Sequence, residues 1–175
     1  MDIVDILVDN LREALRQIQR SVVFGLVASL SLMLLQLSTV TPGTAQPIQL
    51  PGLVVAVDSS IAKILLIVAH IVAGFMALAS LEDARRVARS IKDRPVRDAA
   101  LLYPNAVTNS DPMLRFPACL APPLFFMVAV VAWELAQPER EWFHVIGAFS
   151  FGAMPYVAVA YRAKELIPAV EDASA

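Results

Sequence analysis

The sequence predicts an all-α membrane protein with four transmembrane helices, an amphipathic cytoplasmic helix at the N-terminus and both termini in the cytoplasm. The first observation behind this prediction is composition: of 175 residues, 58% are hydrophobic and 17% are charged, and the mean hydropathy is +0.64. Soluble domains contain about 45–50% apolar and about 25% charged residues. A soluble core does not absorb this excess of apolar side chains, so a bilayer is the expected solvent.

The second observation is that the apolar residues are clustered. A hydrocarbon core about 30 Å thick takes about 20 helical residues to cross. Four apolar runs have this length, at residues 21–40, 61–81, 116–136 and 142–161. Backbone groups inside lipid must bond to one another, and the short alternating segments of a β-barrel are missing from the sequence. Each run is therefore predicted to be a transmembrane helix.

The third observation is the distribution of the 14 Lys and Arg residues. All except Lys63 and Arg140 precede the first run, separate the second from the third, or follow the fourth. Because Lys and Arg concentrate in cytoplasmic loops, the N-terminus, the connection at residues 82–115 and the tail at residues 162–175 are predicted to be cytoplasmic. The high arginine, alanine and valine content favours a bacterial inner membrane.

The first element, residues 1–20, has the spacing of an amphipathic helix. The face opposite the apolar residues mixes acids with arginines, whereas helices that lie on a lipid surface usually have a strongly basic polar face. We therefore expect the apolar face to pack against the helix around residues 81–91 or against a partner. The apolar residues recur every three or four positions: Ile3, Ile6, Leu7, Leu11, Leu15 and Ile18.

Two connections are predicted on the outer side of the membrane. Residues 41–60 contain three prolines and two glycines, which suits a compact loop with a short extended or re-entrant piece at residues 53–57. Residues 137–141 are predicted to form a tight hairpin. Aromatic residues flank this hairpin at the depth where aromatic belts form: Trp133, Trp142 and Phe143.

The connection at residues 82–115 is the predicted binding surface. If the helix of residues 61–81 continues, apolar and basic side chains separate onto opposite faces until Pro95 stops the helix. These basic residues are expected to contact anionic lipid while they anchor the topology, or to dock a protein partner. Nucleic acid is not an expected partner, because no aromatic or glycine-rich pattern interleaves the charges. The candidate residues are Arg85, Arg86, Arg89, Lys92, Arg94 and Arg97.

The third span, residues 116–136, contains three prolines. Pro117, Pro122 and Pro123 each remove a backbone hydrogen bond, so the cytoplasmic third of this span is expected to be kinked or unwound. Broken spans occur at the ligand sites of transporters. Prolines are also tolerated in membrane helices for packing alone. Pro122 and Pro123 are therefore candidate intramembrane functional residues, with a purely structural kink as the alternative.

His70 is the one ionisable residue near the middle of a predicted span, and such residues are often functional. It is a candidate proton carrier or ligand. The alternative is a neutral imidazole that is hydrogen-bonded to a neighbouring helix. Its expected side-chain partners lie on the first and fourth spans: Ser29, Ser31, Gln36 and Ser150.

Signals for chemistry are sparse. Glu141 and His144 have the Glu-x-x-His spacing that places two ligands on one helix face, but a di-iron bundle needs two such motifs and two further carboxylates. They are weak metal candidates beside an interfacial polar role. The sequence lacks a phosphate-binding glycine loop, a zinc-protease motif and a nucleophile elbow. No catalytic residue, metal or other cofactor is predicted.

Small residues at helical spacing indicate close helix packing. Such spacing lets helix backbones approach, within one chain or between copies. Self-association is therefore an expected alternative to a different protein partner. The sets are Gly25 with Ser29, Ala69 with Ala73 and Ala77, and Ala148 with Gly152.

Three functions fit these features. The first is a non-catalytic integral membrane subunit or anchor whose cytoplasmic face docks a partner protein or anionic lipid. The second is an oligomeric channel or small transporter that uses the kinked third span and His70. The third is a membrane enzyme. The charge asymmetry and the lack of catalytic motifs favour the first.

Overall fold

The computed structural model describes residues 2–40, 48–49, 56–57, 59–102, 105–107, 109, 111–139 and 141–167. Two short strands, β1 (Ile48–Gln49) and β2 (Ala56–Val57), pair antiparallel. The remaining elements are α1 (Ile3–Val40), α2 (Ser59–Ser90), α3 (Arg94–Leu101), α4 (Pro112–Leu135), α5 (Phe143–Ala148), the π-helix η1 (Phe149–Ala153), α6 (Met154–Arg162) and the 3-10 helix η2 (Ala163–Leu166).

Four helical segments are long and apolar enough to cross a membrane. They are Ile3–Ser38, Ser59–Ser90, Met113–Leu135 and Phe143–Leu166, the last formed by α5, η1, α6 and η2 in succession. This confirms the predicted all-helical class with four membrane-capable helices. By length and composition the chain is a multi-pass membrane protein.

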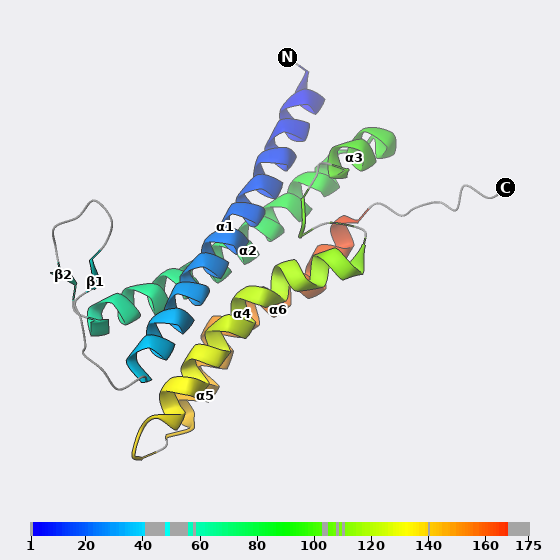
Figure 1. Cartoon of the computed structure of the whole chain (residues 1–175). Helices are drawn as coiled ribbons and strands as arrows, with labels where there is room; N and C mark the ends of the chain where they lie inside the picture. The colour runs from blue at the N-terminus through cyan, green and yellow to red at the C-terminus, as the bar shows by residue number, and fades with distance from the viewer. Residues whose placement is uncertain are drawn as a thin grey trace.

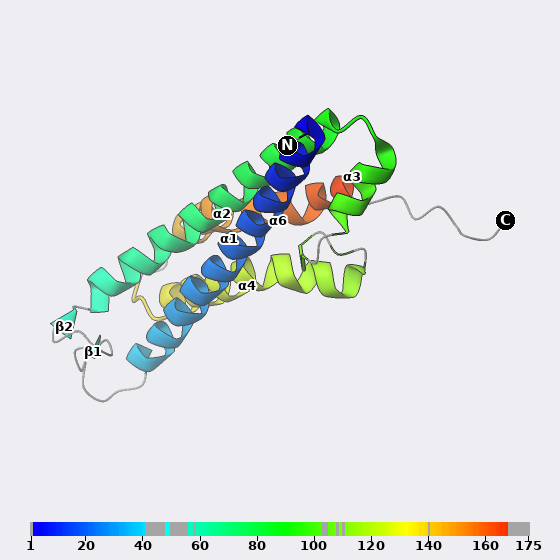
Figure 2. The ribbon, with the colours of Figure 1, turned by 90° about the horizontal axis from the view of Figure 1, so that it is seen from above.

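The helices form an elongated bundle. α1 and α2 run side by side, and α4 and α6 pack against them (Figures 1 and 2). The start of α1, the end of α2 and α3 lie at one end, and the strands and the α4–α5 connection lie at the other (Figure 1). The first end is named the basic end here and comprises residues 3–20 of α1, residues 82–90 of α2, α3 and η2.

α1 is one continuous helix across the predicted ranges 1–20 and 21–40. With 38 residues it is about 57 Å long, well beyond a hydrocarbon core of about 30 Å. On the apolar face of its first half, Leu11, Leu15 and Ile18 are fully buried within the chain, whereas Ile3 and Ile6 nearer the N-terminus remain exposed. At the basic end one buried cluster joins that face to α2, α3 and η2: Leu11, Leu15, Ile18, Leu81, Ala84, Ala88, Ile91, Leu101 and Leu166.

Large apolar side chains remain exposed along the membrane-capable segments. Phe24, Leu65, Leu124 and Phe151 are each more than half exposed. Exposed apolar surface of this extent marks a contact with a partner or a membrane in a folded protein. Lipid is the solvent that suits such a surface on four parallel segments.

Two helix starts at the basic end have side-chain caps. Asp93 accepts a hydrogen bond from the backbone N–H of Val96 at 3.3 Å, so Pro95 stands in the first turn of a new helix, α3, after α2 has ended at Ser90. Asp111 caps α4 in the same way, 2.8 Å from the N–H of Met113. A proline is tolerated in a first turn because its missing N–H has no partner there.

α4 runs unbroken through its prolines. Pro117, Pro122 and Pro123 all lie inside the helix, and the last two are buried. The expected unwinding is therefore not seen between Pro112 and Leu135, while a kink and a ligand role for these prolines stay predictions. Of the expected extended piece at residues 53–57, the described part is β2; the rest lies outside the described residues.

Candidate functional site

His70 lies in the middle of the bundle with its side chain fully buried. Its Nδ1 is 3.1 Å from the carbonyl oxygen of Gly25 on α1, and its Nε2 is 3.1 Å from the carbonyl oxygen of Gly152 in η1. The ring stacks on Phe126 of α4 and on Tyr156 of α6, with centroid distances of 4.3 and 4.9 Å. One imidazole on α2 thus contacts the other three membrane-capable segments.

The chemistry of this site follows from its acceptors. The Tyr156 hydroxyl donates a hydrogen bond to the backbone carbonyl of His70 at 2.9 Å. The acceptor in this contact is therefore a backbone carbonyl, as it is in both contacts of the imidazole. A neutral imidazole carries one N–H and donates to one of its two facing carbonyls, whereas an imidazolium donates to both. Because both nitrogens face carbonyl oxygens and both ring faces are stacked, His70 is enclosed by the bundle and acts as a packing element.

Glycines create the space for the two rings. A Cβ added to Gly25 would lie 1.8 Å from the hydroxyl oxygen of Tyr156, and one added to Gly152 would lie 2.2 Å from Cε1 of Phe126. Gly74 is also tight, at 2.8 Å from Cε2 of Tyr156. The small residues that indicated close helix packing therefore admit aromatic side chains from neighbouring helices.

The partners of His70 differ in kind from the expected ones. The sequence predicted a hydroxyl or amide side chain, but the Ser29 hydroxyl donates to the carbonyl of Leu26 at 3.0 Å and Ser150 is exposed. Glycine leaves its own carbonyl accessible to a side chain from another helix. The π-helix η1, in which Met154 N–H bonds to the carbonyl of Phe149, contributes one of these acceptors.

A second polar cluster joins α4 to α5 at the end of the bundle opposite the basic end. The buried Glu134 accepts a hydrogen bond from the backbone N–H of Glu141, and its Oε2 is 3.3 Å from Nδ1 of His144. His144 is also 3.9 Å from the Glu141 carboxylate. Among the described residues, no group of three or more His, Cys, Asp or Glu side chains is arranged to hold a metal ion.

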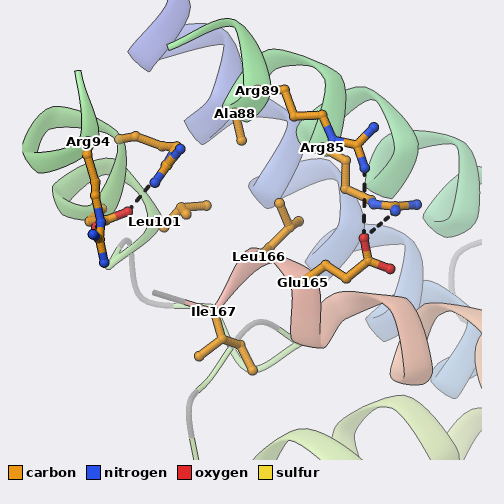
Figure 3. A pocket seen from close by; sticks show the side chains of 10 residues that line it. Arg85, Ala88, Arg89, Arg94, Leu101, Glu165, Leu166 and Ile167 are labelled. Carbon is orange, nitrogen blue, oxygen red and sulfur yellow. Dashed lines mark hydrogen bonds and ion pairs between the residues drawn. The ribbon is translucent and has the colours of Figure 1, made fainter. Parts of the chain in front are cut away.

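Four of the six predicted binding residues line one cavity at the basic end. The cavity has a volume of about 350 Å³ and lies between α2, α3 and η2 (Figure 3). Arg85 and Arg89 project from α2, and Arg94 and Arg97 from α3. We name this feature the arginine cavity. Apolar side chains complete its wall: Ala88, Leu101, Leu166 and Ile167.

Two carboxylates share the arginine cavity. Glu165 of η2 pairs with Arg85 and lies 3.9 Å from Arg89. Asp98 lies 3.6 Å from one arginine of α3 and 3.3 Å from the other. Four arginines against two carboxylates leave a formal charge of +2 on the lining. The cavity thus has the electrostatics of an anion site.

The ion pairs of Arg85 also hold two elements together. Glu82 of α2 bonds to Arg85 at 3.0 Å and to Arg162 at the end of α6. Since Glu165 pairs with Arg85 as well, this network connects α2 to α6 and η2. Arg85 therefore contributes to internal structure, which the sequence pattern did not indicate.

The other two predicted binding residues lie outside the cavity lining. The side chain of Arg86 is 81% exposed, with Asp83 at 3.8 Å, and Lys92 is exposed just after α2. The structure therefore divides the predicted set into a cavity group and an exposed pair.

Several site residues were not predicted from sequence. Phe126 and Tyr156 are aromatic residues within long apolar runs, and the surrounding sequence does not distinguish them from neighbours that face lipid. Glu165 lies in the tail. For Glu134 the sequence did contain a signal, because it is a carboxylate inside an apolar run. Burying such a side chain in a membrane costs free energy unless it has a polar partner.

Comparisons of this chain with protein-family models, with curated proteins and with solved structures find no match.

Proposed function

We propose that this protein is a non-catalytic integral membrane subunit or anchor whose basic end lies in the cytoplasm and docks an acidic surface of a partner protein. The observation that carries the proposal is the buried cluster, which extends from the expected membrane spans into the basic end. The first half of α1, the end of α2, α3 and η2 share this cluster, with Leu11, Leu15 and Ala84 fully buried. A chain that only crosses a bilayer does not need such a core.

The surface over that core supports a protein partner. Arg86 and Lys92 present positive charge that the internal ion-pair network linking α2 to η2 does not include. They stand on or directly after a helix whose opposite face is fixed by packing, so their positions are rigid. Complementary charge contributes to partner choice and to the rate of association.

The geometry around His70 favours anchoring over transport. A proton carrier or ligand must be reached by what it binds, whereas both nitrogens of His70 face carbonyl oxygens and both ring faces are stacked. This residue supports the bundle by joining its four segments.

The test is charge reversal at the exposed pair, Arg86→Glu with Lys92→Glu. The protein is extracted from native membranes in mild detergent, and stoichiometric co-purifying proteins are identified. We expect the double reversal to remove the partner while the chain still resists extraction by alkaline carbonate. Arg85 is left unchanged, because its reversal would break the contacts to Glu82 and Glu165.

The matched control keeps the charge at the same positions, Arg86→Lys with Lys92→Arg, and should retain the partner. A partner that persists in the reversed variant contradicts the proposal. So does wild-type protein that purifies from native membranes without any stoichiometric companion.

A further inference from the structure

The arginine cavity adjoins a second cavity that reaches into the span of α2. The second cavity has a volume of about 600 Å³. Its lining combines apolar side chains of α2 with ion-paired arginines and carboxylates: Phe75, Leu78, Ala79, Glu82, Arg85, Arg162 and Glu165. Arg85 and Glu165 line both cavities. A surface therefore passes from a cluster of arginines to apolar side chains of a membrane-capable helix, which is the polarity order of a phospholipid.

The spacing along α2 matches one leaflet. At 1.5 Å per residue, Phe75 lies about 15 Å from Arg85 along the helix, and half of a hydrocarbon core is about 15 Å thick. Leu81, where the apolar run ends, is about 6 Å from Arg85. Arg85 then stands at the depth of lipid headgroups, which extend about 5–7 Å beyond the hydrocarbon.

The chemistry of the lining suits a phosphate ester. A guanidinium offers a planar fork of donors that matches phosphate oxygens, and Figure 3 shows Arg85 and Arg89 on one wall of the cavity with Arg94 on another. An anion in the cavity would also offset its formal charge of +2.

The apolar part of the wall distinguishes a lipid from a free phosphate. Leu101 and Leu166 lie between the arginines of the two walls (Figure 3). Contact with these apolar side chains does not stabilise inorganic phosphate, whereas it does stabilise the methylene groups of a lipid that adjoin its headgroup. A volume of about 350 Å³ accommodates a headgroup and leaves the acyl chains outside.

We infer that the arginine cavity binds the phosphate headgroup of an anionic membrane phospholipid, whose acyl chains lie along α2 past Leu78 and Phe75. The inference rests on α2 crossing a membrane and does not require the docking of a partner protein. In this inference the cavity arginines bind lipid, and Arg86 and Lys92 are available to contact the partner protein.

The experiment titrates the full-length protein in detergent with phosphatidylglycerol and counts bound lipid by native mass spectrometry. Arg94→Gln with Arg97→Gln removes half of the cavity arginines, and we expect affinity to fall about tenfold or more, because basic residues near the headgroups attract anionic lipid. Arg86→Gln with Lys92→Gln removes the same charge outside the lining and should change affinity much less, because water and salt screen these exposed side chains from the cavity. Phosphatidylcholine, which is zwitterionic, should bind at least about tenfold more weakly than phosphatidylglycerol to the unmodified protein.

Several outcomes would overturn the inference. Equal losses in the two double variants would indicate general surface electrostatics. Glycerol 1-phosphate that competes at the affinity of the lipid would indicate a soluble ligand. A co-purifying protein that is lost with Arg94→Gln and Arg97→Gln, without any change in lipid binding, would assign the cavity to a protein.

A second variant covers the case in which the α3 substitutions disturb folding, as judged by circular dichroism. Arg89→Gln changes a side chain that is 74% exposed and should still weaken phosphatidylglycerol binding about threefold. An unchanged affinity in a folded Arg89→Gln protein counts against the inference. The docking proposal is tested with the exposed pair and the lipid proposal with the cavity arginines, so failure of either proposal is recognised separately.

Discussion

At the scale of single residues, the centre of the bundle depends on glycines, which have no side chain and so leave space for aromatic rings from neighbouring helices. Tyr156 occupies the space beside Gly25 and Gly74, and Phe126 occupies the space beside Gly152. Both rings then stack on His70. Because the aromatic rings fill these spaces closely, a single added methyl group forces a ring or a helix to move.

We predict that Gly152→Ala destabilises the protein by about 1–3 kcal/mol, the usual cost of overpacking a filled core. Its new Cβ would lie 2.2 Å from a ring carbon of Phe126. Thermal unfolding in detergent, followed by circular dichroism, measures the loss. Gly25→Ala should behave in the same way, since its Cβ would meet Tyr156.

Gly147 provides the control for this series. An added Cβ there has no neighbour within 4 Å, so Gly147→Ala should be neutral or stabilise the helix by up to about 1 kcal/mol. If Gly147→Ala and Gly152→Ala have equal effects, the space for the rings is not what these glycines provide.

At the scale of elements, the connection between α4 and α5 depends on one buried carboxylate. Glu134 belongs to α4, yet it accepts the backbone N–H of Glu141 and lies 3.3 Å from Nδ1 of His144. Trp133 packs its edge against the His144 ring at 5.2 Å. These contacts hold the turn closed, and they give the Glu-x-x-His pair a structural role as neighbours of Glu134.

We predict that Glu134→Ala loosens this turn, because the backbone N–H of Glu141 loses its hydrogen bond to the Glu134 carboxyl group, a bond worth about 0.5–3 kcal/mol. Hydrogen exchange of the Glu141 amide should accelerate about tenfold or more, while amides in the middle of α4 keep their protection. Glu139→Ala, at an exposed position in the same turn, should leave the exchange unchanged. Unchanged exchange in Glu134→Ala would contradict this role.

The basic end shows what can be predicted for an element. The separation of apolar and basic side chains on residues 81–91 correctly indicates a helix with one buried face, because that spacing is local. The end of α2 at Ser90 and the start of α3 at Arg94 depend on the cap at Asp93. The sequence contains this cap, and Leu101 at the end of α3 packs into the buried cluster.

At the scale of the whole molecule, orientation remains a prediction that labelling can check. We expect a cysteine at Asp5 to react with a membrane-impermeant maleimide only after permeabilisation, and a cysteine at Glu139 to react in intact cells. Both positions are exposed, and they lie at opposite ends of the bundle. The native Cys119 is buried and should not contribute.

The unmodified protein serves as the labelling control. Reaction of Asp5→Cys in intact cells would place the basic end outside and would contradict the cytoplasmic assignment. Loss of the chain from membranes on carbonate extraction would contradict the membrane assignment itself.

The sequence by itself determined the solvent and the helical class. Partition into lipid depends on the length and polarity of a run, and hydrogen bonding inside a bilayer leaves the helix as the form of each run. Tertiary structure alone decided the sites. His70 meets carbonyl groups 45 and 82 residues away in the chain, and the arginine cavity forms where α3 folds back on α2 and η2. Such contacts depend on how helices cross and rotate, which side-chain volumes across the whole bundle set together.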